Sequence, residues 1–412
     1  MRVCLVSSIH PWINPRAVKE ADWLVAHGYE VHLVTKRVHA WSDRPDESLL
    51  ASKRWHATRV NLLRDDPEGR RRWLATALRA ELAIRAFEWT GNRRLAEAGY
   101  YRGFAEVLDA AVQTCADLYI AHTQGALPIA AQAAARHGVP FAFDCEDLLA
   151  EEAADGLQRP RQRRAILEIE RTYLPLASYV TATSQAMAAY LESHYALTKL
   201  FVVRNVFPLA DLNGVPAPRQ RASKATVELV WISAAIGAGR GLADAVRALA
   251  MLPDHVRLTL FGRMLPAYEE EFWSLVRELE LGNRVSIQPV LDHAAIMPTL
   301  ARFDAGLTLD LNNCLNRSLT IANKVYHYLQ AGLALIATDT PGHHEALRRA
   351  PGAGVIVAAG DVQGLASALR NYVDHADDLL NAKEAAWCAG QTHDNWDRES
   401  DIFRSALETI AL

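Results

Sequence analysis

The chain has 412 residues, which at roughly 100 to 200 residues per domain is enough for two or three domains. Hydrophobic residues make up 50% of it and charged residues 22%, a composition that fits packed globular domains and excludes disorder, collagen and coiled coil. Because 44 Lys and Arg stand against 48 Asp and Glu, the net charge is −4, and nucleic acid or an anionic membrane would need a local basic patch.

The cysteines and the N-terminus indicate the compartment. The five cysteines lie far apart and lack the spacing of a disulfide framework or a zinc site, which indicates a reducing environment. The first apolar run is broken by His10 and Pro11 and is too short for a signal peptide. No window reaches the about 18 apolar residues that cross a bilayer. We therefore expect a cytoplasmic protein that contacts a membrane at most peripherally.

Short apolar runs alternate with longer Ala-rich segments of helical period, which predicts βαβ units around parallel sheets. In the first half, helices near 15–27 and 127–137 should end at Gly28 and Gly138. The strands expected there cover residues 2–8, 30–35, 116–122, 139–144, 178–184 and 199–205. About six parallel strands are thus predicted for the first domain.

A second series of the same kind follows residues 206–225, whose prolines and lack of periodicity are typical of a linker. Its expected strands cover residues 227–233, 256–262, 284–290, 303–310, 333–338 and 354–359. We predict a domain over 1–206, a second over 226–396, and a final helical segment over 397–412 that returns to the first domain. Ligands of two doubly wound domains bind at the carboxyl ends of the strands, across a cleft.

The loop expected after the first strand of the second domain, residues 236–241, contains three glycines and Arg240. Gly237 and Gly239 let backbone N–H groups approach an anion at the helix start, and Arg240 adds a positive charge. The third glycine of a dinucleotide fingerprint is replaced by Leu242, which weakens that interpretation. The loop indicates a diphosphate site, and a tight turn with a solvated arginine is the alternative.

Residues 318–336 read as a loop, a short amphipathic helix from about 320, and a buried strand. Asn323, Lys324 and His327 would share one face of this helix and point into the cleft. The alternative for His327 is an ordinary core or surface histidine.

Four segments resemble motifs of retaining glycosyltransferases of the GT-B fold in the large family four. ANKVYHYLQAGLALIATDTPGHHE is similar to that family's PNK-x-(F/Y)-EY-x-x-AGLPVIATD segment, and IGAGRGLADAVRALAMLPDHVRLTLFG to its G-x-GRGLE segment. NPRAVKEADWLVAHGYEVHLVT resembles its DPRV-x-x-EA segment, and ADLYIAHTQGALP with FDCEDL resembles its ADVYHAHD-x-x-ALP and YDSHEL stretches. The order of the motifs also agrees across both expected domains. The resemblance implies two Rossmann-like, doubly wound domains that face each other across a cleft.

The resemblance also implies transfer of a sugar, with retention, from a nucleoside diphosphate sugar such as a UDP or GDP sugar, without a metal or another cofactor. No DxD motif is present. Arg240 and Lys324 would stabilise the leaving diphosphate and Glu146 would act on the sugar. The donor residues implied are Gly237, Gly239, Arg240, Gly262, Ser318, Leu319, Thr320, Asn323, Lys324 and His327.

The chain departs from the family where carboxylates should bind the ribose, since His327 and Leu319 occupy those positions. An imidazole accepts one hydrogen bond, not the pair that a carboxylate accepts. Glu146, in turn, replaces a histidine near the donor sugar. Three functions stay open: an active transferase, a degenerate sugar-nucleotide binding or scaffold protein, and a nucleotide-sugar epimerase or hydrolase that uses Glu146. A metal site at residues 144–147 is a minor alternative.

The acceptor would lie on the first domain, where the loop after the first strand faces the cleft. Asn14, Arg16, His122 and Glu146 are the expected contacts to a small-molecule, natural-product or glycan acceptor. Arg16 has the alternative of a solvated residue in a first helical turn.

Residues 59–102 hold ten arginines against six acidic residues, interleaved with aromatic residues. This segment is open to three interpretations: a membrane-surface patch for a lipid-linked acceptor, an arm over the acceptor, or a solvated helical insertion. It contains no nucleic-acid-binding motif, and we expect no nucleic acid partner. The sequence leaves the oligomeric state open.

Overall fold

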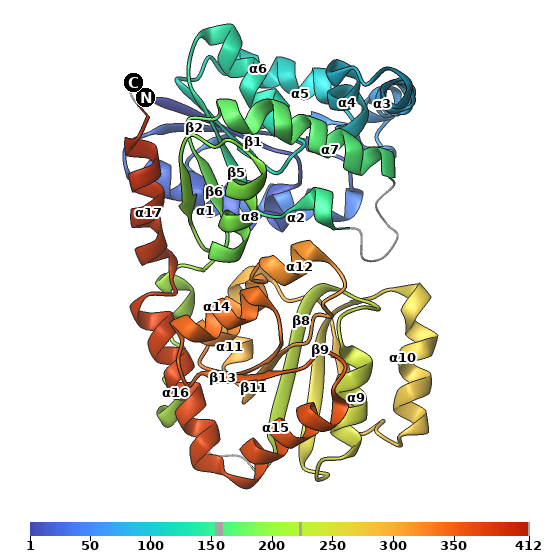
Figure 1. Ribbon diagram of the computed structural model, residues 1–412, viewed down its shortest axis with the longest axis vertical. Helices are drawn as coiled ribbons and strands as arrows, with labels where there is room; N and C mark the ends of the chain where they lie inside the picture. Colours follow the sequence, from blue (N-terminus) through green and yellow to red (C-terminus); the bar gives the residue numbers. More distant parts are fainter. Residues whose placement is uncertain (153–159, 222–224, 411–412) are drawn as a thin grey trace. The chain divides into compact units, whose positions relative to one another are not determined.

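A computed structural model describes residues 1–152, 160–221 and 225–410 (Figure 1). The chain divides into a first unit, Met1–Val203 with Ile402–Leu412, and a second unit, Arg204–Asp401. The expected linker region instead contains short 3-10 turns at Leu209–Leu212 and Pro218–Gln220 within the second unit. Residues 222–224 of that linker and residues 411–412 of the final segment lie outside the described residues.

The first unit is built on one seven-stranded parallel sheet in the order β3-β2-β1-β4-β5-β6-β7. Its strands are β1 (Arg2–Ser7), β2 (Glu30–Arg37), β3 (His56–Asn61), β4 (Leu118–His122), β5 (Phe141–Cys145), β6 (Val180–Ala182) and β7 (Leu200–Val202). The sequence missed β3 because this edge strand has no fully buried residue and therefore no apolar run.

Helices cover both faces of the first sheet, with α5 and α6 on one side and α1 on the other (Figure 1). The helices are α1 (Pro15–Ala26), α2 (Ala40–Ala51), α3 (Pro67–Thr90), α4 (Arg93–Tyr100), α5 (Phe104–Gln113), α6 (Leu127–His137), α7 (Pro160–Tyr173), α8 (Gln185–His194) and the shared α17 (Trp396–Glu408). Asn14 starts α1, because its side chain accepts a hydrogen bond from the Ala17 N–H at 3.1 Å. In the later part of α17, Phe403 packs on Trp23 of α1.

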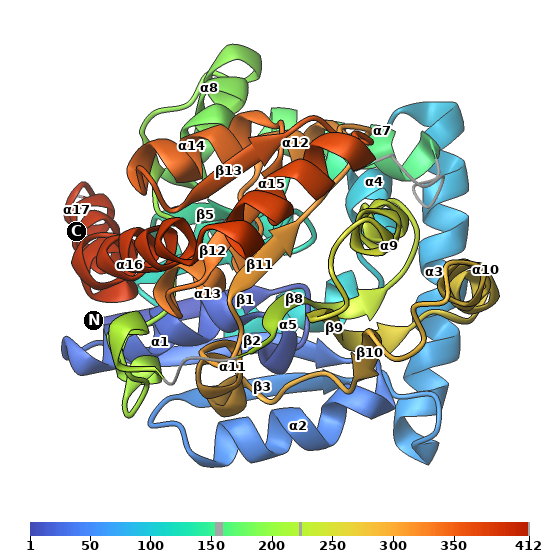
Figure 2. The same cartoon turned by 90° about the horizontal axis from the view of Figure 1, so that it is seen from below.

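The second unit has a six-stranded parallel sheet in the order β10-β9-β8-β11-β12-β13. Its strands are β8 (Val227–Ile236), β9 (Val256–Met264), β10 (Val285–Gln288), β11 (Ala305–Thr308), β12 (Ala334–Thr338) and β13 (Gly354–Val357). Its helices are α9 (Leu242–Ala250), α10 (Pro266–Glu278), α11 (His293–Leu300), α12 (Leu315–Leu319), α13 (Asn323–Gln330), α14 (Pro341–Arg349), α15 (Val362–Asp374) and α16 (Ala376–Thr392). Helices α9 and α15 pack together on one face and α13 and α16 on the other (Figure 2).

Both sheets therefore have the doubly wound order, and the predicted pair of Rossmann-like α/β domains is confirmed. The strand order reverses between β1 and β4 in the first unit and between β8 and β11 in the second. Loops after these strands lie at the points where such folds bind ligands. Among the described residues, no helix is both long and apolar enough to cross a bilayer.

Candidate active site

The reversal point of the second sheet carries the glycine-rich loop, residues 237–241, which joins β8 to α9. Gly241 precedes the helix with φ +67°, in the left-handed region, and a Cβ there would run into the backbone carbonyl of Leu309 after β11. Glycine is thus required at this position both for its backbone conformation and for the close approach of the two loops. The close approach brings Arg240 beside Asp310.

Two cations of the second unit converge on the carboxylate of Asp310. Arg240 Nη1 lies 3.2 Å from Asp310 Oδ1, and Lys324 Nζ, at the start of α13, lies 3.9 Å from Oδ2. Lys324 also lies 4.5 Å from the centre of the Trp231 ring. The structure therefore brings together the two cations that the sequence assigned to the diphosphate, through an aspartate that the sequence did not single out.

The pKa values in this group follow from burial and pairing. Burial opposes the charge of Asp310, but Lys324 and then Arg240 outweigh it and lower the pKa of Asp310 to about 2. Burial lowers the pKa of Lys324, and Asp310 counteracts this effect. Asp310 therefore favours the charged form of a buried lysine, and the group as a whole holds one more positive than negative side chain.

A buried histidine, His343, forms hydrogen bonds to the ends of β11 and β12 near Asp310. His343 Nδ1 lies 2.8 Å from the Thr338 carbonyl oxygen, so this nitrogen carries the proton and donates. Its Nε2 accepts from the Thr308 hydroxyl at 3.1 Å. Burial lowers the pKa of His343, which fits the neutral ring that this pattern requires.

The segment predicted as a loop before the donor helix is instead the short helix α12, and this corrects the sequence prediction. The Ser318 and Thr320 hydroxyls donate to the carbonyl oxygens of Cys314 and Asn316, at 3.0 and 2.7 Å. These bonds satisfy the hydroxyls locally, in the i−4 pattern that Ser and Thr adopt within a helical turn. Helix α13 accordingly begins at Asn323, later than the predicted start near 320. Leu319, the last residue of α12, is half-buried.

His327 lies on the buried face of α13 and stacks on Phe207, with ring centres 3.7 Å apart and planes inclined by 19°. Gln330, one turn on, holds the Phe207 backbone: its Oε1 accepts from the Phe207 N–H at 3.1 Å and its Nε2 donates to the carbonyl at 2.8 Å. The face of the imidazole is thus covered by an aromatic ring of its own unit. The predicted ribose contact of His327 stays a prediction.

Gly262, another predicted donor residue, lies in β9 where its pairing with β8 shifts register between Ile232 and Ala235. A Cβ on Gly262 would come within 2.7 Å of the Ser233 carbonyl oxygen, so only glycine permits this approach. No described interaction joins Gly237, Gly239 or Gly262 to Arg240 or Lys324.

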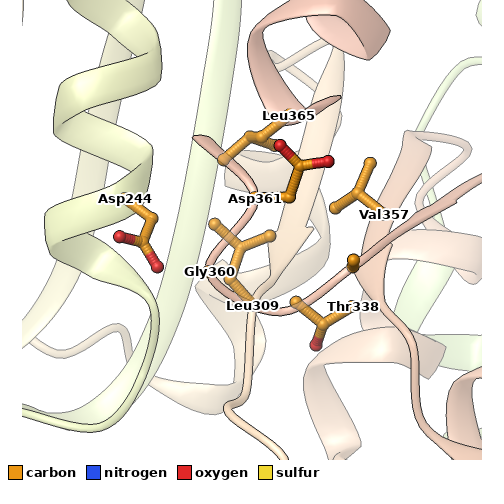
Figure 3. A pocket seen from close by; sticks show the side chains of 8 residues that line it. Asp244, Leu309, Thr338, Val357, Gly360, Asp361 and Leu365 are labelled. Carbon is orange, nitrogen blue, oxygen red and sulfur yellow. The ribbon is translucent and has the colours of Figure 1, made fainter. Parts of the chain in front are cut away.

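A small pocket lies beside these groups at the carboxyl ends of β11, β12 and β13 (Figure 3). Asp244 of α9 and Asp361 before α15 lie on two sides of it, and Leu309, Thr338 and Val357 come from the strand ends. It has no basic side chain in its lining, so it does not fit a diphosphate.

The reversal point of the first sheet holds a buried ionic network. Arg16 of α1 is fully buried; its Nε and Nη2 donate to the two Asp144 oxygens at 2.5 and 2.7 Å, and its Nη1 donates to the Val203 carbonyl at 2.8 Å. Arg16 is therefore not the solvated first-turn residue of the alternative interpretation. Its donors are used within the unit, and its predicted contact with an acceptor stays a prediction.

His122 at the end of β4 lies among three carboxylates of this network. Its Nε2 is 3.2 Å from Glu20, and its Nδ1 is 3.1 Å from Asp144 and 3.3 Å from Glu146. Burial opposes the charged imidazole, but these carboxylates outweigh it and raise the pKa of His122 well above its usual range. Glu20, His122 and Asp144 are close enough to share a metal ion, yet Arg16 already takes both Asp144 oxygens.

Glu146 is the network member that reaches the surface. Its side chain is 12% exposed, while those of Glu20, His122 and Asp144 are almost completely buried. Asn14 Nδ2 donates to Glu146 Oε1 at 2.9 Å and so holds the carboxylate in place. Of the four predicted acceptor residues, Glu146 is the one whose position best suits contact with a ligand.

Residues 13–205 match the model of the glycosyl transferase 4-like domain. No curated protein sequence matches the chain significantly.

Solved structures resemble the chain over its full length. Sucrose-phosphate synthase from Thermosynechococcus elongatus has 15% identity and a TM-score of 0.71, covering 99% of this chain and 100% of its own. Anabaena HepE in complex with UDP-glucose has 17% identity and a TM-score of 0.69, covering 99% of both chains. The E. coli trehalose-6-phosphate synthase bound with UDP-2-fluoro glucose has 14% identity and a TM-score of 0.67, covering 100% of both. At these identities the likeness establishes the GT-B fold.

The matched domain and the shared fold agree with the sequence motifs. Residues 13–205 therefore match a glycosyl transferase 4-like domain, and the whole chain has the GT-B fold. The sequence analysis missed Asp310, although Asp310 ends an expected strand and is an acidic residue at a ligand-binding edge, a signal that could have identified it.

The sequence analysis also missed an aromatic cluster on the first unit. Trp12 follows β1, and His39 and Trp41 follow β2, so all three lie at the carboxyl edge of the sheet. Trp41 is 57% exposed; its ring centre lies 6.1 Å from that of Trp12 and 5.8 Å from that of His39. Residues 12 and 41 lie far apart in sequence, and the parallel pairing of β1 with β2, together with the hydrogen bond from the Trp12 N–H to Asp46 of α2, brings the two segments together.

Proposed function

We propose that the chain is a retaining glycosyltransferase that transfers a sugar from a nucleoside diphosphate sugar, with UDP or GDP as the nucleotide. The convergence of Arg240 and Lys324 on Asp310 at the reversal point of the second sheet carries this proposal. A diphosphate bears the negative charge that this pair of cations can bind, with Asp310 keeping them in place until it arrives. Structures of similar fold that contain UDP or UDP-glucose add support for a uridine nucleotide.

In the proposed reaction the acceptor hydroxyl oxygen bonds to the anomeric carbon while the bond from that carbon to the diphosphate oxygen breaks. Attack from the face that the diphosphate leaves retains the configuration, and the diphosphate takes the acceptor proton. Arg240 and Lys324 stabilise the charge that develops on the leaving oxygen, the main electrostatic task of this step. This route requires no enzyme nucleophile and no cofactor.

The acceptor is proposed to bind the first unit, as a small molecule, a natural product or a glycan. Glu146, oriented by Asn14, is the polar group available to a hydroxyl. The exposed indole of Trp41, backed by Trp12, offers a flat apolar surface for the C–H face of a sugar ring. Among the three acceptor classes these aromatics favour a saccharide.

One observation supports a second function, binding of a sugar nucleotide without turnover. His327 and Leu319 replace the carboxylates of the family motif, and His327 is stacked on Phe207. A site that cannot hold the ribose could bind the diphosphate through the two cations and still fail to position the sugar.

Two measurements separate these functions. The first is thermal stability with UDP, GDP, ADP or dTDP, because a ligand at a hundred times its dissociation constant stabilises by about 2.7 kcal/mol. The second is release of nucleoside diphosphate from a panel of UDP and GDP sugars, with and without saccharide acceptors, and assignment of the product's anomeric configuration by NMR. A thermal shift with turnover only when acceptor is present supports the transferase. A shift without turnover across the panel supports the binding protein, and an inverted product refutes retention.

A further inference from the structure

Helix α3 presents a row of large apolar side chains to solvent. Leu74, Leu78 and Leu82 are 56%, 63% and 58% exposed, and Trp89 near the end of the helix is 91% exposed. The leucines are spaced four residues apart and Trp89 falls on the same side at 100° per residue, so the four form one stripe, here named the leucine stripe. The exposed apolar side chains of soluble proteins are usually scattered, and a contiguous stripe marks a contact surface.

The leucine stripe is not needed for the core of the first unit. The opposite side of α3 supplies that core: Thr76, Ala83, Ile84 and Phe87 are buried, and Ile84 and Phe87 belong to a cluster with α4 and α7. Both views place α3 at the border of its unit, outside α4 (Figures 1 and 2). The helix is thus apolar on two sides, with one side used for folding and the other facing outward.

Basic side chains accompany the stripe. Arg72, Arg79 and Arg85 are ion-paired with Glu68, Glu106 and Glu81. Over the described part of the chain, no acidic side chain pairs with Arg70 or Arg71. Arg71 falls within the angular range of the leucine stripe and Arg70 lies beside it. The outward side of α3 therefore combines leucine, tryptophan and arginine, and its two acidic residues, Glu81 and Glu88, are paired with Arg85 and Arg161.

We propose that α3 lies flat on an anionic bilayer surface, with the leucine stripe in the headgroup region and Arg70 and Arg71 against the lipid phosphates. This combination is that of helices that bind in the plane of the interface, where tryptophan is also favoured. Charge complementarity argues for this occupant, since the two free arginines need negative groups beside an apolar layer.

A second copy of the chain fits the stripe less well. A stable protein interface takes about 800 Å² from each partner and some 20 to 30 residues a side, which one row of side chains on one helix does not supply. The inference is independent of the proposed function, because vesicle binding requires neither donor nor turnover. If the membrane inference and the proposed function both hold, the preferred acceptor is one that resides at a membrane surface.

Co-sedimentation with vesicles tests the proposal, using phosphatidylcholine alone and phosphatidylcholine mixed with phosphatidylglycerol. The full chain should bind the anionic vesicles and lose binding as salt rises. Leu78→Gln should weaken binding about 5-fold, and the triple substitution of Leu74, Leu78 and Leu82 by Gln on the order of 100-fold. Arg71→Gln should weaken it about 5-fold, the effect of one basic residue near an anionic surface.

Matched controls separate the stripe from general changes of the surface. Leu176→Gln alters a leucine of the same unit that is 65% exposed, and Arg54→Gln alters an exposed arginine away from α3. Both should leave vesicle binding unchanged, and all variants should keep the wild-type melting temperature because the altered side chains face solvent. Equal binding to the two vesicle types, full binding by the triple variant, or a dimer in sedimentation that the triple variant abolishes would each overturn the proposal.

Discussion

At the carboxyl edge of the first sheet, the guanidinium of Arg16 has no exposed surface and is bound by Asp144 and the Val203 carbonyl. At the same edge of the second sheet, the Arg240 side chain is 32% exposed and shares the single carboxylate of Asp310 with Lys324. The two sheets have the same strand order, so the difference arises from the side chains at that edge. In the first unit Arg16 and His122 are enclosed by carboxylates, whereas in the second Arg240 and Lys324 share one carboxylate, which leaves one positive charge in excess.

The contrast separates two uses of a charged residue at a ligand-binding edge. A buried charge that is bound on all sides fixes loops relative to one another, and its removal should cost stability. A cation in surplus over its counter-charges is available to an anion, and its removal should cost binding and turnover.

The largest effect is expected from Arg16→Met, which removes the cation of the first network and leaves Asp144 and Glu20 buried without it. Breaking a buried ion pair on one side costs about 3 to 5 kcal/mol. Urea denaturation should therefore show a free energy of unfolding lower by that amount. Arg54→Met, at an exposed position, is the control and should stay within about 0.5 kcal/mol of wild type. If Arg16→Met lowered the free energy of unfolding by less than about 1 kcal/mol, the ionic network would not be important for stability.

The next effect is on turnover, from Arg240→Ala and Lys324→Ala. Each removes a charge proposed to stabilise the leaving diphosphate, a loss of about 100- to 1,000-fold in kcat, or about 2.7 to 4 kcal/mol. Steady-state rates of nucleoside diphosphate release measure it. Lys324→Arg retains the charge and should recover part of the rate. If both alanine variants kept the wild-type kcat, neither Arg240 nor Lys324 would contribute to catalysis.

Asp310→Asn tests whether Asp310 keeps Lys324 charged at the carboxyl edge of the second sheet. Burial lowers the pKa of Lys324 and Asp310 raises it, so loss of the carboxylate should lower it further and leave more neutral lysine as pH rises. The dissociation constant for UDP or GDP should increase on the order of tenfold at alkaline pH and recover as pH falls. Calorimetric titration across pH measures this. Tighter binding at every pH would instead mean that Asp310 mainly competes with the diphosphate.

The first network should also give a distinct pH dependence of stability. Because the pKa of His122 is raised, its stabilisation is complete below the ordinary value of about 6.5 and is lost as pH rises through the raised value. The pKa of Asp144 is lowered, so its stabilisation is lost as pH falls below its ordinary range. Melting temperatures should thus decline on the alkaline side.

His122→Gln should flatten that alkaline decline while lowering stability overall. His137→Gln, which changes an exposed histidine of the same unit, should leave the slope of the decline unchanged. An unaltered slope in His122→Gln would show that His122 is not the group responsible.

The sequence predicted the regular parts of the fold well, because long periodic segments such as 127–137 and the buried strands carry their own pattern. It missed β3, whose residues are half-buried or exposed and form no apolar run. It read 318–320 as a loop, although residues 318 and 319 are the end of helix α12.

The candidate site, too, was predicted only in part. Motifs identified Arg240 and Lys324, since both lie in short continuous patterns. Their shared partner Asp310, the stacking of His327 on Phe207 and the burial of Arg16 depend on packing between distant segments. Such contacts have no local signal, so a residue's chemistry could be predicted while its accessibility could not.

The smallest effect is expected from a change of Trp41, which lies at the carboxyl edge of the first sheet and is not part of the ionic network around Arg16. Trp41→Ala should raise the KM for a soluble saccharide acceptor about 5-fold, the loss of about 1 kcal/mol from one stacking contact, with kcat and the donor KM unchanged. Because Trp41 is 57% exposed, the melting temperature should change little. Trp89→Ala removes an even more exposed tryptophan on α3 and should leave the same KM unaltered. An acceptor KM that rises in Trp89→Ala and not in Trp41→Ala would move acceptor recognition from the sheet edge to the leucine stripe, and the first edge would then serve the fold alone.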